Sequence, residues 1–298
     1  MLGLSIAIGS VAFTLVKIAL RELSPMSLAM GRVVVSALVF VAVVGLQPWR
    51  RRPVPPRERF LVLLCGFGGS AGFHLVFNVG IERVSVAVGA VIMATTPVLV
   101  AVGEVLFLHH RLRPRQVAGL GFTVAGCVVI GVSGTSAGNS SLLGVLFVFA
   151  SALVWAGVTV ATRSVTDAYD PWWLNTPGTV LGALFVVLVN IGGISEFGHL
   201  SLKGWLAVVW LGSASSAFIY YAFAKVMREI SATAAMSAST VVTPSSVLVA
   251  WLVLGDRPTL VQVLGGVVVL AGVVLVTRRS AADEVTMVPS ASASTGTH

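Results

Sequence analysis

The sequence predicts an all-α membrane protein with ten transmembrane helices, arranged as two inverted five-helix repeats around a central cavity. Of its 298 residues, 56% are hydrophobic and 10% are charged, and the mean hydropathy is +0.97. A soluble domain carries about 25% charged residues, so this composition is typical of a polytopic membrane protein. Two further observations support the prediction: a succession of long apolar runs, and a pattern that recurs 146 positions along the chain.

The apolar runs are each about long enough to cross roughly 30 Å of hydrocarbon as a helix. The first lacks the basic start of a signal peptide, so we interpret it as a span. Proline, glycine or charged residues separate several of the runs, as in "LSP" (23–25) and "DAYDPWW" (167–173). The predicted spans are 2–20, 28–46, 60–80, 86–107, 117–134, 142–162, 172–191, 204–224, 232–254 and 260–276.

The basic residues predict the orientation. The net charge is +8, but the Lys and Arg residues cluster in short connections rather than on a polar domain, which argues against a nucleic-acid partner. With a cytoplasmic N-terminus, thirteen of them fall in inner connections and four in outer ones. We therefore expect a multi-pass protein of the inner (plasma) membrane, surrounded by lipid bilayer, with both termini cytoplasmic. The polar segment 279–298 is expected to be a disordered cytoplasmic tail.

An internal duplication explains two similar junctions. "ERVSVAVGA" (82–90) and "REISATAAM" (228–236) each place a charged pair, an apolar residue and a serine before an apolar run. The same offset of 146 maps Gly119 onto Gly265 and Ala125-Gly126 onto Ala271-Gly272. The predicted repeats are 1–136 and 137–278. Because each has an odd number of helices, the second must be inverted, a construction typical of alternating-access transporters.

Three stretches resemble the EamA type of the drug/metabolite transporter superfamily. They are "FTLVKIALRELSPMSLAMGR" (13–32), "PVLVAVGEVLFLHHRLRPRQVAG" (97–119) and its partner "TPSSVLVAWLVLGDRPTLVQVLGG" (243–266). The resemblance covers the chain to about residue 278. It implies ten helices, a central cavity and export of small metabolites, such as amino acids, or of toxic amphiphiles, often driven by a proton gradient. His109-His110 and Asp256 depart from the Gly-Glu that the family pattern places at these two positions.

Polar residues within spans are candidates for a substrate site, because they cost free energy unless they face a cavity or a partner. In the third span they share one helical face with aromatic residues, and the offset of 146 pairs Ser70 with Ser216, His74 with Tyr220 and Phe77 with Phe223. We expect contact with a small-molecule substrate from His74, Asn78 and Tyr220, with Phe77 and Phe223 as apolar walls. His74 is also a candidate carrier of a coupling proton. The alternative is that His74 and Asn78 only link helices.

Four other positions leave alternatives open. Trp155, near the middle of its span, favours a cavity wall over an interfacial anchor. Lys17 is a candidate ligand for a substrate carboxylate or a headgroup anchor. Glu104 either pairs with Arg111 or contributes to coupling, and Arg32 reads as a structural or gating charge. Prolines after Thr96 and Thr243 interrupt two spans, so either a hinge or exposed carbonyls could follow.

Motifs of enzymes and of cofactor sites are absent from the sequence. It contains no Gly-x-Ser-x-Gly, no His-Glu-x-x-His and no Walker loop, and its two cysteines, Cys65 and Cys127, lie within apolar runs. We therefore expect no enzyme activity, no cofactor and no metal site. Two alternatives to a metabolite exporter remain: an exchanger or importer of organic anions or metabolites, and a non-transporting membrane sensor or scaffold. The oligomeric state is not predicted.

Overall fold

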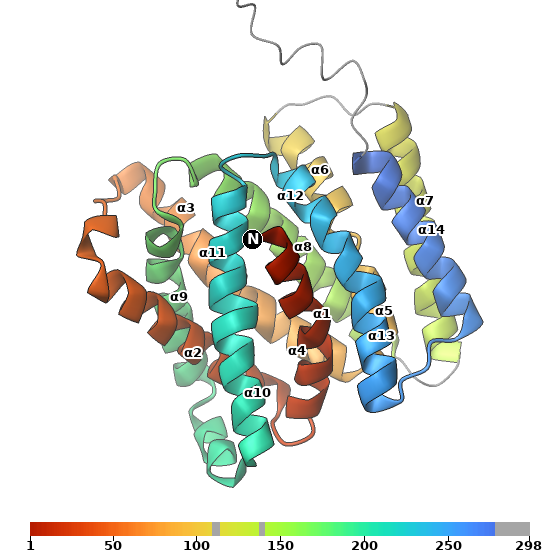
Figure 1. The fold of residues 1–298 in the computed structure, drawn as a ribbon, viewed down its shortest axis with the longest axis horizontal. Helices are drawn as coiled ribbons and strands as arrows, with labels where there is room; N and C mark the ends of the chain where they lie inside the picture. Colours follow the sequence, from red (N-terminus) through yellow and green to blue (C-terminus); the bar gives the residue numbers. More distant parts are fainter. Residues whose placement is uncertain (109–113, 137–140, 278–298) are drawn as a thin grey trace, which may run out of the picture.

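The structure, a computed structural model, describes residues 1–108, 114–136 and 141–277. Every regular element in these ranges is helical (Figure 1). The elements are α1 Leu2–Ala19, α2 Pro25–Leu46, η1 Pro48–Arg50, α3 Pro56–Phe67, η2 Gly68–Gly72, α4 Phe73–Glu82, α5 Val86–Met93, α6 Thr96–Leu108, α7 Pro114–Ser136, α8 Leu142–Val165, α9 Pro171–Val189, η3 Ile191–His199, α10 Leu202–Gly212, η4 Ser213–Phe218, α11 Ile219–Val226, α12 Ala232–Ala238, η5 Ser239–Val241, α13 Val242–Leu254 and α14 Leu260–Thr277.

The helices are long and apolar enough for a multi-pass membrane protein. In the part of the chain that the structure describes, six stretches have the length and hydropathy of a membrane span and four other apolar helices are shorter, at 10–17 residues, so the count of ten spans stays a prediction. His109, His110, Arg111 and the predicted disordered tail lie outside the described residues. Among the described residues, the six stretches long enough to span a membrane are Pro25–Leu46, Pro56–Glu82, Val86–Phe107, Leu142–Val165, Pro171–Val189 and Leu202–Val226.

Three of these six stretches, and the stretch that contains α12 and α13, are not continuous α-helices. η2 joins α3 to α4, and η4 joins α10 to α11; both are π-helical. α5 and α6 meet at a turn over Ala94 and Thr95, and the 3-10 segment η5 precedes α13. The expected interruptions near Thr96 and Thr243 are therefore present in the structure, because a proline in the first turn of each following helix begins that helix anew.

Helix starts are fixed by capping residues in the sequence. Ser24 precedes Pro25 of α2, and Asp170 precedes Pro171 of α9; each side chain accepts a hydrogen bond from a first-turn backbone N–H. Such caps satisfy donors that have no partner within the helix, and proline is well suited to the first helical position. Ser24 and Asp170 are 146 positions apart, the same offset at which other residues recur in the sequence.

Glycines allow close crossings between the helices of the two halves. A Cβ atom added at Gly66 of α3 would lie 2.7 Å from Cα of Gly178 in α9. α7 and α14 lie side by side at one edge of the molecule (Figure 1). There a Cβ at Gly126 would lie 2.6 Å from a methyl carbon of Val269, and one at Gly272 would lie 2.6 Å from the Gly119 carbonyl oxygen. Small residues at such contacts are typical of helix packing in membranes.

Candidate functional site

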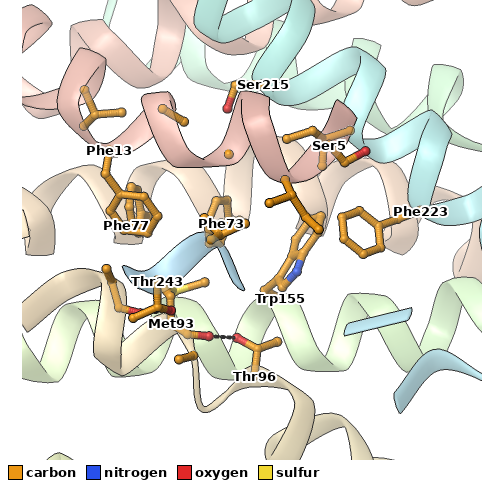
Figure 2. Close-up of a pocket in the computed structure, with 18 of the residues that line it drawn as sticks. Ser5, Phe13, Phe73, Phe77, Met93, Thr96, Trp155, Ser215, Phe223 and Thr243 are labelled. Atoms are coloured by element: carbon orange, nitrogen blue, oxygen red, sulfur yellow. Dashed lines mark hydrogen bonds between the residues drawn. The ribbon is translucent and has the colours of Figure 1, made fainter. Parts of the chain in front are cut away.

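A cavity of about 150 Å³ lies between helices of both halves of the chain (Figure 2). α1 forms one side, and the discontinuous helices α5–α6 and α12–α13 contribute residues next to their breaks. The remaining lining comes from α2, α4, α8, η4 and α11. Its residues are Ser5, Ile6, Gly9, Ala12, Phe13, Val16, Arg32, Phe73, His74, Phe77, Ala90, Met93, Ala94, Thr96, Trp155, Ser215, Ile219, Tyr220, Phe223, Met236, Val242 and Thr243.

Aromatic rings form a continuous series along this cavity. Phe13 meets Phe77 edge to face with centroids 5.7 Å apart, and Phe77 stacks on Phe73 at 5.2 Å. Phe73 lies 5.4 Å from Trp155, which in turn lies 5.3 Å from Tyr220. Figure 2 shows these rings, Tyr220 excepted, with Phe223 beyond Trp155. Such a wall favours an apolar or aromatic group of a ligand, because ring contacts add to the gain from buried area.

The side chains of Ser216 and Tyr220 meet at His74. Its Nε2 lies 2.9 Å from Oγ of Ser216 and 2.9 Å from the hydroxyl of Tyr220. Each hydroxyl has one proton, and each also has a carbonyl acceptor: Tyr220 donates to Gly69 at 2.5 Å and Ser216 to Leu211 at 2.9 Å. Both hydroxyl oxygens are then acceptors toward the imidazole. This pattern assigns the ring proton to Nε2 and leaves Nδ1 as a lone pair, which has no partner among the described residues.

The two π-helical segments position this cluster. η2 ends at Gly72, two residues before His74, and η4 ends at Phe218, two residues before Tyr220. A π-turn has one more residue than an α-turn and so rotates the following helix relative to the preceding one. The Ser216 hydroxyl bonds the Leu211 carbonyl five residues earlier. Sequence periodicity does not reveal these segments, which decide the direction in which His74 and Tyr220 point.

Arg32 of α2 is the one cation that borders the cavity within the described chain. It is 3% exposed, and one guanidinium nitrogen lies 3.5 Å from Oδ1 of Asn78. Its Nε has no partner, and it forms no ion pair with a described residue. Sequence reasoning treated Arg32 as a structural or gating charge; the signal that it faces a site was its position inside a span.

The structure brings together most of the residues that the sequence singled out. His74, Phe77, Trp155, Tyr220 and Phe223 line the cavity. The other predicted residues do not border it. Ser216 lies behind the lining and contacts His74, Ser70 is buried and donates to the Gly66 carbonyl, and Asn78 bridges Arg32 and the Pro25 carbonyl. Sequence reasoning missed Phe73, Met93 and Ser215, whose periodicity does not distinguish a cavity wall from core.

Lys17 lies elsewhere, in an open cleft that we call the charged cleft. Its Nζ donates to the Glu82 carbonyl at 3.2 Å, and Asp256 in the same cleft accepts from the Val86 backbone N–H at 3.0 Å. Arg21, Arg83 and Arg257 also line this cleft. A substrate in the central cavity would therefore not reach Lys17 without moving. Glu104 accepts a hydrogen bond from Thr233, while its expected partner Arg111 lies outside the described residues.

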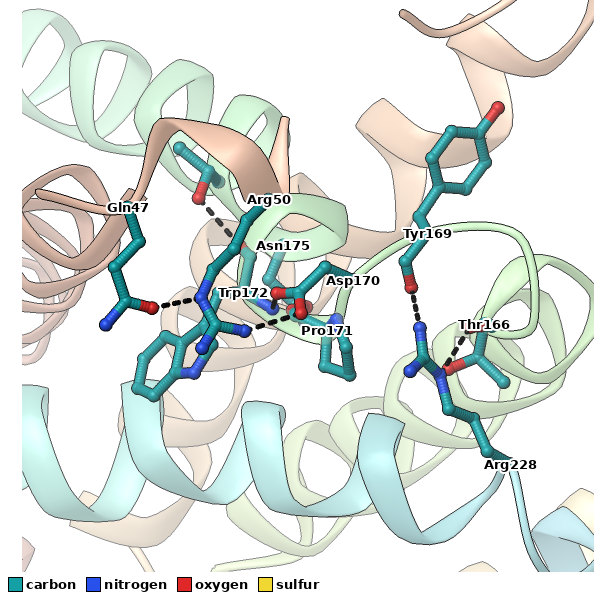
Figure 3. A network of polar contacts seen from close by, with 10 residues as sticks. Gln47, Arg50, Thr166, Tyr169, Asp170, Pro171, Trp172, Asn175 and Arg228 are labelled. Atoms are coloured by element: carbon teal, nitrogen blue, oxygen red, sulfur yellow. Dashed lines mark hydrogen bonds and ion pairs between the residues drawn. The ribbon is translucent and has the colours of Figure 1, made fainter. Parts of the chain in front are cut away.

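A polar network joins the connections near the end of α2 to the start of α9 (Figure 3). Arg50 forms a 2.6 Å ion pair with the capping carboxylate of Asp170 and also donates to the side chain of Gln47. Arg228, which follows α11, donates to the backbone carbonyls of Thr166 and Tyr169. The Arg50–Asp170 pair links the two halves at this end of the bundle, and the Arg228 contacts tie the end of α11 to the connection between α8 and α9.

The sequence matches the model of the EamA-like transporter family twice, over residues 1–132 and 142–278. The chain belongs to the EamA-like transporter family. Together, the matched segments cover nearly the whole chain, so the membership applies to both halves. The protein is thus a multi-pass membrane protein of a transporter family. Among the described residues, no group of three or more His, Cys, Asp or Glu side chains is placed to hold a metal ion.

Relatives of this EamA-like protein are themselves named as transporters. It is 25% identical over 281 residues to a probable terminal-alkyne amino-acid exporter of Streptantibioticus cattleyicolor, covering 94% of this chain and 93% of that protein. An uncharacterized transporter of Archaeoglobus fulgidus is 26% identical, with 93% and 98% covered. The transporter YdfC of Bacillus subtilis is 25% identical, with 91% and 88% covered.

A solved structure has a similar fold. One protein crystal structure superposes with a TM-score of 0.63, covering 92% of this chain and 96% of the other, at 21% sequence identity. At this identity the likeness concerns the fold alone. The family and the relatives give the class of the protein, and the residues that line the cavity bear on its substrate.

Proposed function

We propose that this protein is a secondary active transporter that exports small metabolites, amino acids or similar polar compounds, across the plasma membrane by alternating access. The observation that carries the proposal is the contact between His74 and Tyr220 at the central cavity. They occupy equivalent positions in the duplication, 146 residues apart, and their side chains are 2.9 Å from one another. Equivalent residues touch where the axis relating two halves passes, so the cavity lies at the centre of the repeats.

The proposed architecture is ten spans in two inverted five-helix repeats, 1–136 and 137–278, with both termini cytoplasmic. Three observations support it. The family model matches each half separately. The π-helical segments η2 and η4 fall at positions related by the same offset. The paired residues Arg50 and Asp170 have Glu196 and Ser24 as their equivalents, and Ser24 donates to Glu196 at 2.9 Å.

Alternating access follows from this symmetry. Two similar halves can rock about a shared site and expose it to one side of the membrane and then to the other. Discontinuous helices at such a site present backbone groups to a ligand. Here the Thr243 hydroxyl donates to the Ala90 carbonyl at 3.2 Å, which joins α5 and α13 beside the cavity. We propose that these two helices are where the halves move against each other.

Protons are the proposed coupling ion. The chain has no nucleotide-binding motif, so uphill transport needs an ion or substrate gradient. His74 is buried and borders the cavity, and its Nδ1 is without a hydrogen-bond partner among described residues. A proton arriving at Nδ1 would place a positive charge beside the substrate, which connects protonation with substrate binding.

A second candidate is exchange or uptake of an organic anion, and Arg32 favours it. A buried guanidinium at the cavity attracts negative charge whatever the direction of transport. The amino-acid exporter among the relatives favours export instead. Direction of transport therefore separates the two candidates.

The test is counterflow in proteoliposomes preloaded with one member of a panel of amino acids and organic acids, with tracer outside and with or without a pH gradient. Saturable exchange of one compound, reduced by Tyr220→Phe, is the expected result. Tyr221→Phe is the matched control, because Tyr221 does not line the cavity and stacks on Trp172 at 4.4 Å instead. No exchange of any compound by correctly folded protein would refute the proposed transport and favour the sensor or scaffold.

A further inference from the structure

The buried charge of Arg32 lacks a partner of opposite sign. The side chain is 97% shielded from solvent, and no Asp or Glu is among the described residues that line the cavity. Burying an isolated cation costs free energy because the cation loses its hydration shell. The protein interior compensates for that loss only where an anion or several hydrogen-bond acceptors surround the charge. A bound anion would provide what the described protein residues do not.

The hydrogen-bond donors of Arg32 are also largely unused. A guanidinium has five N–H groups in a fixed fork. In the described chain one of them faces Asn78 Oδ1 at 3.5 Å, which is longer than an ordinary N–H···O bond, and Nε has no partner. If Arg32 only linked α2 to α4, we would expect short bonds that satisfy the fork. Free donors that border a cavity are what a ligand carboxylate requires.

The other residues that line the cavity indicate the chemistry of the part of the ligand that does not contact Arg32. Its walls are the aromatic series from Phe13 to Trp155, with hydroxyls from Thr96 and Thr243. An apolar protein cavity of about 150 Å³ holds a molecule the size of benzene. That volume fits a branched alkyl group or a single ring and is too small for a large amphiphile, whose sites measure roughly 300–1,000 Å³. A small inorganic anion would leave the aromatic walls without contact.

We propose that Arg32 binds the carboxylate of the transported substrate, and that the substrate is a small monocarboxylate with a compact apolar group for which an α-amino group is not required. This inference rests on the proposed function, because it treats the central cavity as the transport site. No described carboxylate lines the cavity to hold an ammonium group, so amino acids and their deaminated analogues belong to one class. Amines that lack a carboxylate are excluded from it.

Two matched sets of compounds test this inference by equilibrium binding to the purified full-length protein. One set is leucine, 4-methylpentanoate and 3-methylbutylamine; the other is phenylalanine, 3-phenylpropionate and 2-phenylethylamine. Binding is followed by the shift in thermal unfolding and by dissociation constants. We expect the acids and amino acids of at least one set to bind and the amines not to bind. This comparison on the wild-type protein needs no variant to fold.

The variants then assign the binding to Arg32. Arg32→Gln is expected to weaken carboxylate binding about 10- to 100-fold, the usual effect of losing a charge-assisted hydrogen bond. Arg32→Lys should cause an intermediate loss, because lysine keeps the charge without the fork. Arg57→Gln is the control, since the Arg57 side chain is 85% exposed.

Several outcomes would overturn the inference: amines that bind as well as acids, equal affinity of Arg32→Gln and wild type, or no stabilisation by any carboxylate of either set. Counterflow measured on the same preparations separates the two proposals. Binding through Arg32 without exchange would uphold Arg32 as the carboxylate ligand of this cavity and refute transport. If the wild type and Arg32→Gln exchange the same compound at the same rate, transport is upheld and the role of Arg32 in binding the carboxylate is refuted.

Discussion

Arg50 pairs with Asp170 at one end of α2, and at its other end Ser24 pairs with Glu196, the same two positions displaced by 146 residues. One pair is an ion pair of 2.6 Å, and the other is a serine hydroxyl donating to a carboxylate at 2.9 Å. Positions related by this offset are thus in contact at both ends of α2, although the chemistry of the two pairs differs.

The first prediction concerns this ion pair. Asp170→Asn should destabilise the protein by about 1 kcal/mol or less, because the side chains of the pair are 28% and 23% exposed and water weakens their attraction. Asp170→Ala should cost about 1 kcal/mol more, since alanine also removes the cap that accepts from the Trp172 backbone N–H at 3.0 Å. In thermal unfolding in detergent, the melting temperature should be highest for the wild type, lower for Asp170→Asn and lowest for Asp170→Ala. Equal melting of the two variants would contradict the capping role.

The second prediction concerns the crossing of α3 and α9. Gly66→Ala would place a methyl group 2.6 Å from the Asn175 carbonyl oxygen and 2.7 Å from Gly178 Cα, so the helices must separate. We expect a loss of stability of about 1–3 kcal/mol. Gly157→Ala on α8 is the matched control, because nothing lies within 4 Å of its added methyl group. A Gly66→Ala protein that melts like the control would show that the helices are not in close contact.

The third prediction concerns pH. Hydrogen bonds from the backbone N–H and hydroxyl of Ser201 lower the pKa of Glu22. The native state therefore binds fewer protons there than the unfolded state, and the stability that results is present above the ordinary pKa and lost as pH falls through the lowered value. When unfolding is measured from pH 7 to pH 3, Glu22→Gln should lose less stability than the wild type does.

Glu229→Gln serves as the control for that series, because it removes an exposed carboxylate from another connection. It should lose stability with pH as the wild type does. If the Glu22 and Glu229 variants behaved alike, the contact with Ser201 would not stabilise the folded state.

The fourth prediction concerns proton coupling. Glutamine at position 74 can still hydrogen-bond Ser216 and Tyr220 but cannot bind a proton near neutral pH. In proteoliposomes, His74→Gln should retain exchange without a gradient and lose the acceleration that a pH gradient causes. A variant that keeps wild-type dependence on the gradient would exclude His74 as the proton carrier.

Periodicity found part of the site because it depends on local geometry. Residues spaced three and four apart share a helical face, so His74 and Phe77 were expected together, and the structure places both on the cavity. Asn78, on the same predicted face, instead lies behind the lining and contacts Arg32. The π-helical segment before this stretch turns α4 as a whole relative to α3, so that Phe73, His74 and Phe77 line the cavity, and composition alone does not specify such a turn.

By itself, the sequence determined that the chain is a multi-pass helical membrane protein of a transporter family, because hydropathy, proline and capping residues and family motifs are local properties. The repeat at an offset of 146 was visible for the same reason. The tertiary structure decided which polar groups meet. It placed Arg32 on the cavity and Lys17 in the charged cleft, because the direction of a side chain depends on how helices distant in sequence pack against each other.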